Sequence, residues 1–228
     1  AYEMLRSLVG SEMCIRDRSL KGLIGRTGGK SRLKKKIRGM IPPHTTYIEP
    51  FVGGGSVFFS APADPNRKEV INDKDKEVAQ IYMDVKNVGD KIQNITPPDK
   101  EGFNRLKGQT KFSSPVERLR RNLILSLYSF RSDRRNFAFS KARMPELQAR
   151  QSQGSSQKKY EKYKERLKNT RILNQDYKTV IKKYDNPNAF IYLDPPYSTA
   201  TDSNDYNDND IRIEDIINLL KTVKGKFI

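Results

Sequence analysis

The chain has 228 residues, which is enough for one large domain or for one domain that carries an insertion. Its 44 Lys and Arg residues outnumber 27 Asp and Glu residues, and the net charge of +17 favours a polyanionic partner such as nucleic acid. No apolar run approaches the ~20 residues of a membrane span, and a single cysteine (Cys14) with a single histidine (His44) excludes internal disulfides and Cys- or His-rich metal sites.

The first 18 residues have neither helical nor alternating periodicity. Residues 7–18 resemble a translated sequencing adapter, and the stretch has no signal-peptide core or cleavage site. We therefore expect residues 1–18 to be a non-native or disordered leader outside the fold, and we expect a reducing, cytoplasmic compartment.

The next part of the chain alternates between strand and helix patterns. The predicted elements are a basic helix over residues 30–40, a strand over 47–49, a helix opening at 56–60, a strand over 69–72 and an amphipathic helix over 76–87. This β-α-β-α order is typical of the start of a parallel sheet.

The alternation then gives way to a basic segment. Residues 100–171 hold 20 Lys and Arg against 6 Asp and Glu, so nearly all of the charge asymmetry lies there. Helices are predicted over 116–130 and 158–168. We expect residues 96–169 to be a mainly helical domain inserted between the two parts of an α/β domain, 19–95 and 170–228. A solvated basic surface without a partner is the alternative.

The strand and helix pattern resumes after the basic segment. A strand is predicted over 171–174, a central parallel strand in the apolar run 189–193 and a helix over 210–223. The last residues, 226–228, have the pattern of an opening strand, so we expect the last strands of the sheet and the natural C-terminus to be missing.

Two glycine segments are candidates for ligand loops. Residues 25–31 resemble a phosphate-binding loop, but the first glycine of GxxxxGK[ST] would fall on Ile24, and Gly25 is one residue too close. Residues 53–55 follow a strand, and Asp73 comes twenty residues later at the end of the next strand. That order predicts a ligand on the glycine turn with its ribose on Asp73, although the turn is not the GxGxxG of nicotinamide enzymes.

The segment from Asp194 to Tyr197 (Asp-Pro-Pro-Tyr) follows the buried strand, at the sheet edge where α/β proteins bind ligands. An exocyclic adenine amine is a weak nucleophile because its lone pair is delocalised into the ring. The Asp194 carboxylate and the Pro195 carbonyl can each accept one of its N–H groups, and two prolines stiffen the turn. Tyr197 offers a ring for a base extruded from a duplex. The alternative is a structural Pro-rich turn.

Together these segments resemble the Dam-type family of adenine-N6-specific DNA methyltransferases. The matching pieces are Gly28-Gly29-Lys30, residues 49–59, Asn72-Asp73, residues 174–177 and residues 194–197. The resemblance implies a Rossmann-like, class I S-adenosylmethionine-dependent sheet with an inserted target-recognition domain. It also implies S-adenosylmethionine as cofactor, double-stranded DNA as partner, no metal and a monomer, with roles in site-specific DNA methylation and restriction-modification.

The site residues that follow from the motifs and the resemblance fall into three groups. The catalytic group is Asp194, Pro195, Pro196 and Tyr197. The cofactor group is Arg26, Lys30, Glu49, Pro50, Phe51, Gly53, Gly54, Gly55, Asp73, Asp176, Tyr177 and Asp194. The DNA-binding group is Arg131, Arg134, Arg135, Asn136, Lys141 and Arg143.

This sequence departs from the family in two places. Arg26 stands where family members commonly carry an aromatic residue, and residues 129–139 replace the family's recognition pattern, which leaves the target sequence open. Two other functions also remain open: a non-catalytic basic nucleic-acid-binding protein, and a methyltransferase for cytosine N4, RNA or a protein amide. Asp194 favours adenine because those relatives more often carry Ser or Asn before the two prolines.

Overall fold

The computed structural model describes residues 19–25, 29–93, 95–130, 134–138, 156–196 and 211–228. Five predicted site residues lie outside the described residues: Arg26, Arg131, Lys141, Arg143 and Tyr197. The same is true of the predicted leader, residues 1–18.

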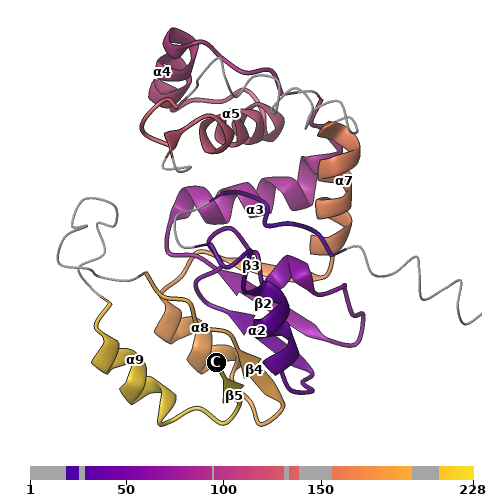
Figure 1. Cartoon of the computed structure of the whole chain (residues 1–228), viewed down its shortest axis with the longest axis vertical. Helices are drawn as coiled ribbons and strands as arrows, with labels where there is room; N and C mark the ends of the chain where they lie inside the picture. The colour runs from indigo at the N-terminus through magenta and orange to yellow at the C-terminus, as the bar shows by residue number, and fades with distance from the viewer. Residues whose placement is uncertain (1–18, 26–28, 94, 131–133, 139–155, 197–210) are drawn as a thin grey trace, which may run out of the picture.

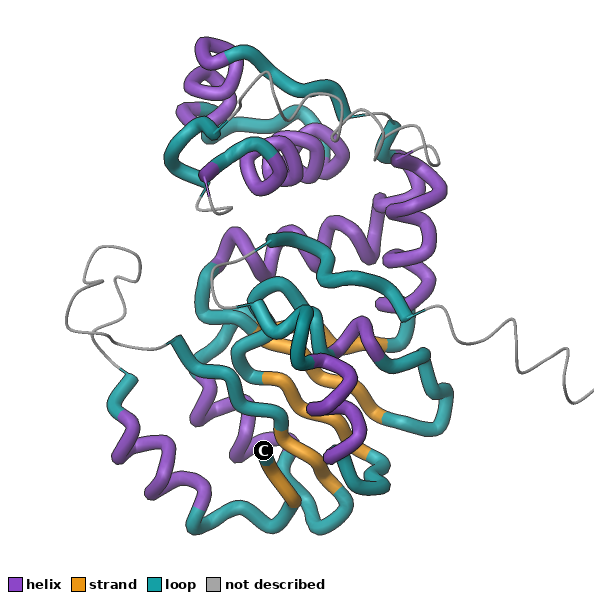
Figure 2. Tube along the Cα trace, in the orientation of Figure 1, coloured by secondary structure: helices purple, strands orange, loops and turns teal. Residues whose placement is uncertain are grey.

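The centre of the fold is a sheet of five parallel strands in the order β3-β2-β1-β4-β5 (Figures 1 and 2). The strands are β1 (Thr46–Glu49), β2 (Lys68–Asn72), β3 (Thr170–Leu173), β4 (Ala189–Ile191) and β5 (Lys226–Phe227). Ile48 of β1 is in register with Val70 of β2 and with Ile191 of β4. Because all strands run the same way, their carboxyl ends meet at one edge, and the predicted α/β parallel sheet is confirmed.

Alternate residues of each strand face opposite sides of the sheet and build two hydrophobic cores. Tyr47, Ile71 and Phe190 face one core, which the residues of α3 (Lys76–Val88) complete. Ile48, Val70 and Ile191 face the other core, which α8 (Tyr177–Tyr184) and α9 (Ile213–Leu220) cover. The result is a three-layer arrangement with helices on both faces (Figure 1).

Several helical segments differ from the sequence prediction. The basic helix is shorter than expected: α2 covers Lys34–Met40, because residues 31–33 form turns. The helix expected at 56–60 is a single 3-10 turn, η1 (Phe58–Ser60). The helix α8 was not predicted, although Tyr177, Val180, Ile181 and Tyr184 have helical spacing and are buried.

The described residues between α3 and β3 form three further α-helices, α4 (Lys100–Gly108), α5 (Pro115–Leu127) and α7 (Ser156–Leu167). Figure 1 shows α4 and α5 above α3, with α7 beside them. Arg118 of α5 donates to both carboxylate oxygens of Asp84 on α3, at 2.8 and 2.7 Å. The first core continues without interruption from the sheet through α3 to Phe103, Leu119 and Tyr160.

That continuity shows that the helices between β2 and β3 pack directly on the α/β layers. It does not test the predicted boundaries 96 and 169, which stay a prediction. Of the helices in the described part, α4 was not predicted, and none is long and apolar enough to cross a membrane.

Candidate functional site

The glycine turn after β1 has a backbone that only glycine adopts without strain. Gly53 and Gly55 have φ angles of 47° and 70°. A Cβ on Gly54 would lie 2.5 Å from the Ile24 carbonyl oxygen, and one on Gly55 would lie 2.5 Å from the Tyr82 hydroxyl. That hydroxyl donates to the Gly53 carbonyl at 3.0 Å. Both α3, through Tyr82, and the segment that contains Ile24 therefore contact the glycine turn.

Asp73 lies directly against this turn. Its Oδ2 accepts the Gly53 N–H at 2.8 Å, and its Oδ1 accepts the Asp75 N–H at 2.9 Å. Asp73 is only 8% exposed. The structure thus brings the acid after β2 to the glycine turn, as the twenty-residue offset predicts, and it shows that the carboxylate also fixes the turn.

Asn72, which had no predicted role, joins the ends of three strands. Its amide nitrogen donates to the Pro50 carbonyl at 2.9 Å and to the Gln175 carbonyl at 3.0 Å. Its oxygen accepts the Gln175 N–H at 2.9 Å. The residue is 1% exposed, so these bonds are shielded from water. The turns after β1 and β3 are therefore both fixed to the end of β2.

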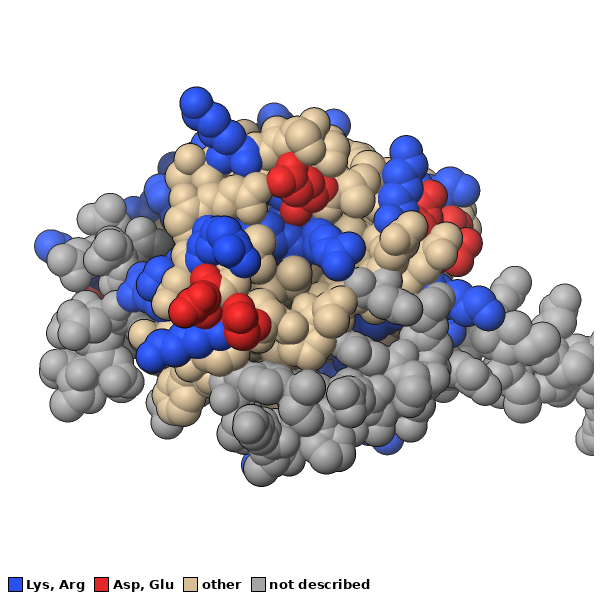
Figure 3. All heavy atoms as spheres, turned by 90° about the horizontal axis from the view of Figure 1, so that it is seen from above, with Lys and Arg blue, Asp and Glu red and all other residues tan. Residues whose placement is uncertain are grey.

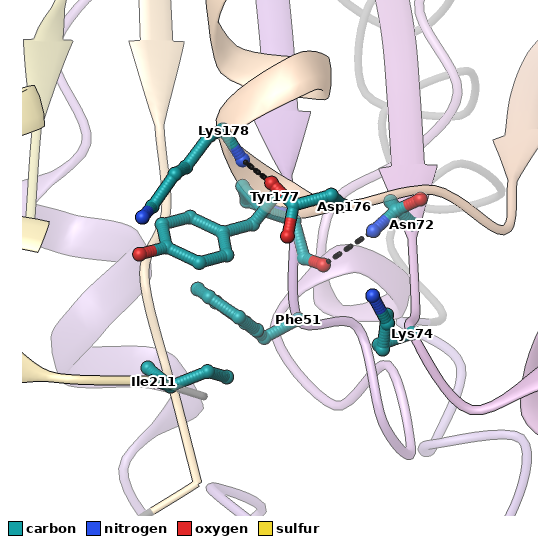
Figure 4. A pocket seen from close by; sticks show the side chains of 8 residues that line it. Phe51, Asn72, Lys74, Asp176, Tyr177, Lys178 and Ile211 are labelled. Atoms are coloured by element: carbon teal, nitrogen blue, oxygen red, sulfur yellow. Dashed lines mark hydrogen bonds between the residues drawn. The ribbon is translucent and has the colours of Figure 1, made fainter. Parts of the chain in front are cut away.

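A pocket opens between these two turns (Figure 4). The residues that line it are Pro50, Phe51, Asn72, Lys74, Asp176, Tyr177, Lys178 and Ile211. The rings of Phe51 and Tyr177 have centroids 5.2 Å apart, and Asp176 caps α8 by accepting the Lys178 N–H at 2.8 Å. The pocket is partly open to solvent, and its two aromatic rings suit a flat aromatic ligand such as a nucleobase. Of these lining residues, Pro50, Phe51, Asp176 and Tyr177 were predicted from the sequence as site residues.

Asp194 follows β4 at the same edge of the sheet. Its Oδ1 accepts from the Lys30 ammonium at 2.7 Å, and the two side chains are 21% and 18% exposed. Pro195 and Pro196 are half-buried. Lys30 and Asp194 are 164 positions apart in the sequence, and the structure brings the lysine of the first glycine segment to the carboxylate of the predicted catalytic turn.

Glu49 ends β1, the neighbour of β4, and is 2% exposed. Burial raises the pKa of its carboxyl to about 8, and the negative charge of Asp194 also raises it. The hydrogen bond from the Tyr47 hydroxyl lowers this pKa, but by less than burial raises it. That hydroxyl lies 2.6 Å from Glu49 Oε2, and burial together with Glu49 raises the pKa of Tyr47 as well. A cation bound beside such a buried carboxyl would favour its ionised form and lower its pKa.

The predicted DNA-binding residues that the structure describes lie in a short turn after α5. Phe130 donates its N–H to the Asn136 carbonyl at 2.8 Å, and Arg134 has a φ angle of 61°. The Arg134 guanidinium forms ion pairs with Asp75 and Glu77 at the start of α3. Arg135 is exposed. Arg134 therefore connects the turn to α3, whereas Arg135 faces outward.

Basic side chains spread over the face formed by α4 and α5, with fewer acidic ones between them (Figure 3). The exposed cations of this region are Lys100, Arg105, Lys107, Lys111, Arg120 and Arg135. Within the described ranges, no group of three or more His, Cys, Asp or Glu side chains is placed to hold a metal ion.

Comparison with known proteins gives a consistent result. The model of the D12 class N6 adenine-specific DNA methyltransferases matches residues 27–227. The type II methyltransferase M1.LlaDCHI of Lactococcus lactis subsp. cremoris is 25% identical, over 89% of this chain and 77% of its own length. M.CviBI of Paramecium bursaria Chlorella virus NC1A is 26% identical over 91% and 81%. M.MjaIII of Methanocaldococcus jannaschii is 24% identical over 80% and 74%.

Proposed function

The chain belongs to the family of D12 class N6 adenine-specific DNA methyltransferases, and we propose that it uses S-adenosylmethionine to methylate adenine within a specific DNA sequence. The main support for the proposal is that three features lie at the same edge of the sheet. These are the glycine turn with Asp73, the pocket between Phe51 and Tyr177, and the Asp194 turn. Its type II relatives support a role in restriction-modification.

The residues present fit S-adenosylmethionine. The pocket between Phe51 and Tyr177 has apolar rings for the adenine of the methyl donor, and Asp176 lies at its rim. The Asp73 carboxylate is a hydrogen-bond acceptor at the glycine turn, which suits ribose hydroxyls. A cationic group beside Glu49 would favour its ionised carboxylate, and the donor carries two such groups: an ammonium and a sulfonium.

Methyl transfer requires that the protein activate the adenine N6 amine, which is a weak nucleophile. S-adenosylmethionine supplies an electrophilic methyl group, so the N6 lone pair forms the new N–C bond while the bonding pair of the broken S–C bond stays on sulfur. The Asp194 carboxylate accepts one N6–H and stabilises the positive charge that develops on nitrogen. The Pro195 carbonyl accepts the second N6–H. Asp194 then takes the proton that N6 loses, and it passes the proton to solvent.

The DNA is held by the basic helices between β2 and β3. The exposed cations of α4, α5 and the turn after α5 suit phosphate contacts, which supply most of the salt-dependent affinity of DNA-binding proteins. The target adenine reaches Asp194 by leaving the base stack, because N6 lies inside the duplex. Tyr197, Arg131, Lys141 and Arg143 lie outside the described residues and keep their predicted roles as part of this proposal, as does Arg26 at the methyl donor.

The decisive experiment replaces Asp194 with Ala. Losing a preorganised group where charge develops costs on the order of a hundredfold to a thousandfold in rate, whereas DNA affinity and the circular dichroism spectrum should be unchanged. Methyl transfer is followed by mass spectrometry of nucleosides from methylated DNA, with Glu214→Ala, an exposed acid on α9, as the control. An Asp194→Ala enzyme as fast as wild type would mean that the Asp-Pro-Pro turn is structural.

A further inference from the structure

One ion pair connects the first glycine segment to the strand end that carries the chemistry. The Lys30 ammonium donates to Asp194 Oδ1 at 2.7 Å, with both side chains about four-fifths shielded from solvent. A charge-assisted bond in such surroundings is stronger and better oriented than one on the open surface. Lys30 therefore does more in this structure than lie beside a ligand site.

The backbone of Lys30 is anchored as well. Its carbonyl accepts the Leu33 N–H at 3.0 Å in the turn that leads into α2. Arg38 of α2 in turn donates to the Ser60 carbonyl at 2.8 Å, at the end of η1. The lysine is thus fixed to the 3-10 turn that directly follows the glycine turn, and it reaches Asp194 from that fixed base.

On the basis of the proposed function, we propose that Lys30 is a positioning residue for methyl transfer. It holds Asp194 by Oδ1, so that Oδ2 is presented to the target amine. A carboxylate has lone pairs on both oxygens and can accept from the ammonium and from N6–H together. A rotating carboxylate would lose the alignment on which the rate depends, because displacements of about 1 Å at a reacting group cost up to about a hundredfold.

The charges around Asp194 agree with this role. Glu49, which ends the neighbouring strand, has a pKa raised to about 8 by burial and by Asp194, so at neutral pH it is mostly uncharged. The charge of Asp194 is then balanced by the ammonium of Lys30. A purely cofactor-holding lysine would need no contact with the catalytic carboxylate, and here that contact is made.

The test separates positioning from cofactor binding. Lys30→Met keeps the apolar stem and removes the charge, Lys30→Arg keeps the charge, and Lys34→Met, a half-buried lysine of α2, is the matched control. We expect Lys30→Met to lower kcat by about tenfold or more with the KM for S-adenosylmethionine changed by less than about threefold. Lys30→Arg should recover part of the loss, and Lys34→Met should behave as wild type.

A double-mutant cycle with Asp194→Ala completes the test. If Lys30 acts through Asp194, Lys30→Met should cause no further loss in the Asp194→Ala enzyme. An equal loss in both backgrounds, or a raised KM with kcat retained, overturns the inference. If Lys30→Met does not fold, Lys30→Gln, which also removes the charge, takes its place in the cycle with Asp194→Ala. The proposed function is judged separately, because it stands or falls on methylation by wild type and on the loss with Asp194→Ala alone.

Discussion

The ionisation of Glu49 can show whether this carboxyl contacts the positively charged methyl donor. With a pKa of about 8, roughly one Glu49 carboxyl in ten is ionised at pH 7, so full ionisation on binding costs about 1.4 kcal/mol. If the donor's positive charge makes that carboxyl ionise, binding at pH 7 should release about 0.9 proton. The Glu49→Gln variant has no proton to release.

The assay is isothermal titration calorimetry of S-adenosylmethionine in phosphate and in Tris at pH 7. The difference in binding enthalpy between the buffers gives the number of protons released. Glu49→Gln reports the background from the donor's own amine, and Glu214→Gln, an exposed acid, should match wild type. A wild-type enthalpy that is the same in both buffers, or a Glu49→Gln value equal to that of wild type, would refute the assignment of Glu49 to the donor site.

The same carboxyl affects the stability of the free protein. Unfolded Glu49 ionises near pH 4.5, but the folded carboxyl keeps its proton up to about pH 8. Between these values the folded state binds more protons, so the free energy of unfolding attributable to this group falls as the pH rises and levels off above pH 8. Urea titrations at pH 5 and 7.5 should show that decline in wild type and a smaller one in Glu49→Gln.

Two further predictions concern the cofactor-binding residue Asp73 and the two arginines of the turn after α5. Asp73→Ala should weaken S-adenosylmethionine binding by about 1–3 kcal/mol, since a charged acceptor is lost and Gly53 loses its partner; unchanged affinity by calorimetry would remove Asp73 from the site. Arg135→Ala should flatten the slope of log DNA affinity against log salt by roughly one unit. Arg134→Ala should instead lower the melting temperature with the slope retained, because its guanidinium pairs with Asp75 and Glu77; equal slopes for the two variants would contradict this distinction.

Much of the α/β architecture could be predicted from the sequence. Apolar runs such as residues 189–193 and glycines before a helix are local signals, and the resemblance supplied their order; the family and the adenine-N6 activity are confirmed. The helix α8 was missed because Tyr177 was interpreted as a ligand contact, although its spacing to Val180, Ile181 and Tyr184 is helical. Local propensity also overestimated α2, whose first residues form turns.

The contacts that assemble the site were harder to predict because they join distant parts of the chain. Asn72 and Gln175 are 103 positions apart, and Lys30 and Asp194 are 164 apart. Asn72 and Gln175 were recognisable in the sequence only as polar residues beside motifs, and Lys30 and Asp194 were predicted as site residues but not as bonding partners. Which atoms they bond follows from the strand order, and no periodicity in the sequence encodes it. The individual site assignments therefore remain predictions that the variants above can test.

The helix α3 packs against both the sheet and α5, and this affects how the protein unfolds. One face of α3 completes the core beneath the sheet, while Asp84 and Glu77 on the same helix hold Arg118 and Arg121 of α5. Neither layer can lose α3 and keep its own packing. We therefore expect α4, α5 and α7 to unfold together with the sheet in one cooperative transition, and the backbone amides of α3 to be among the last to exchange with solvent.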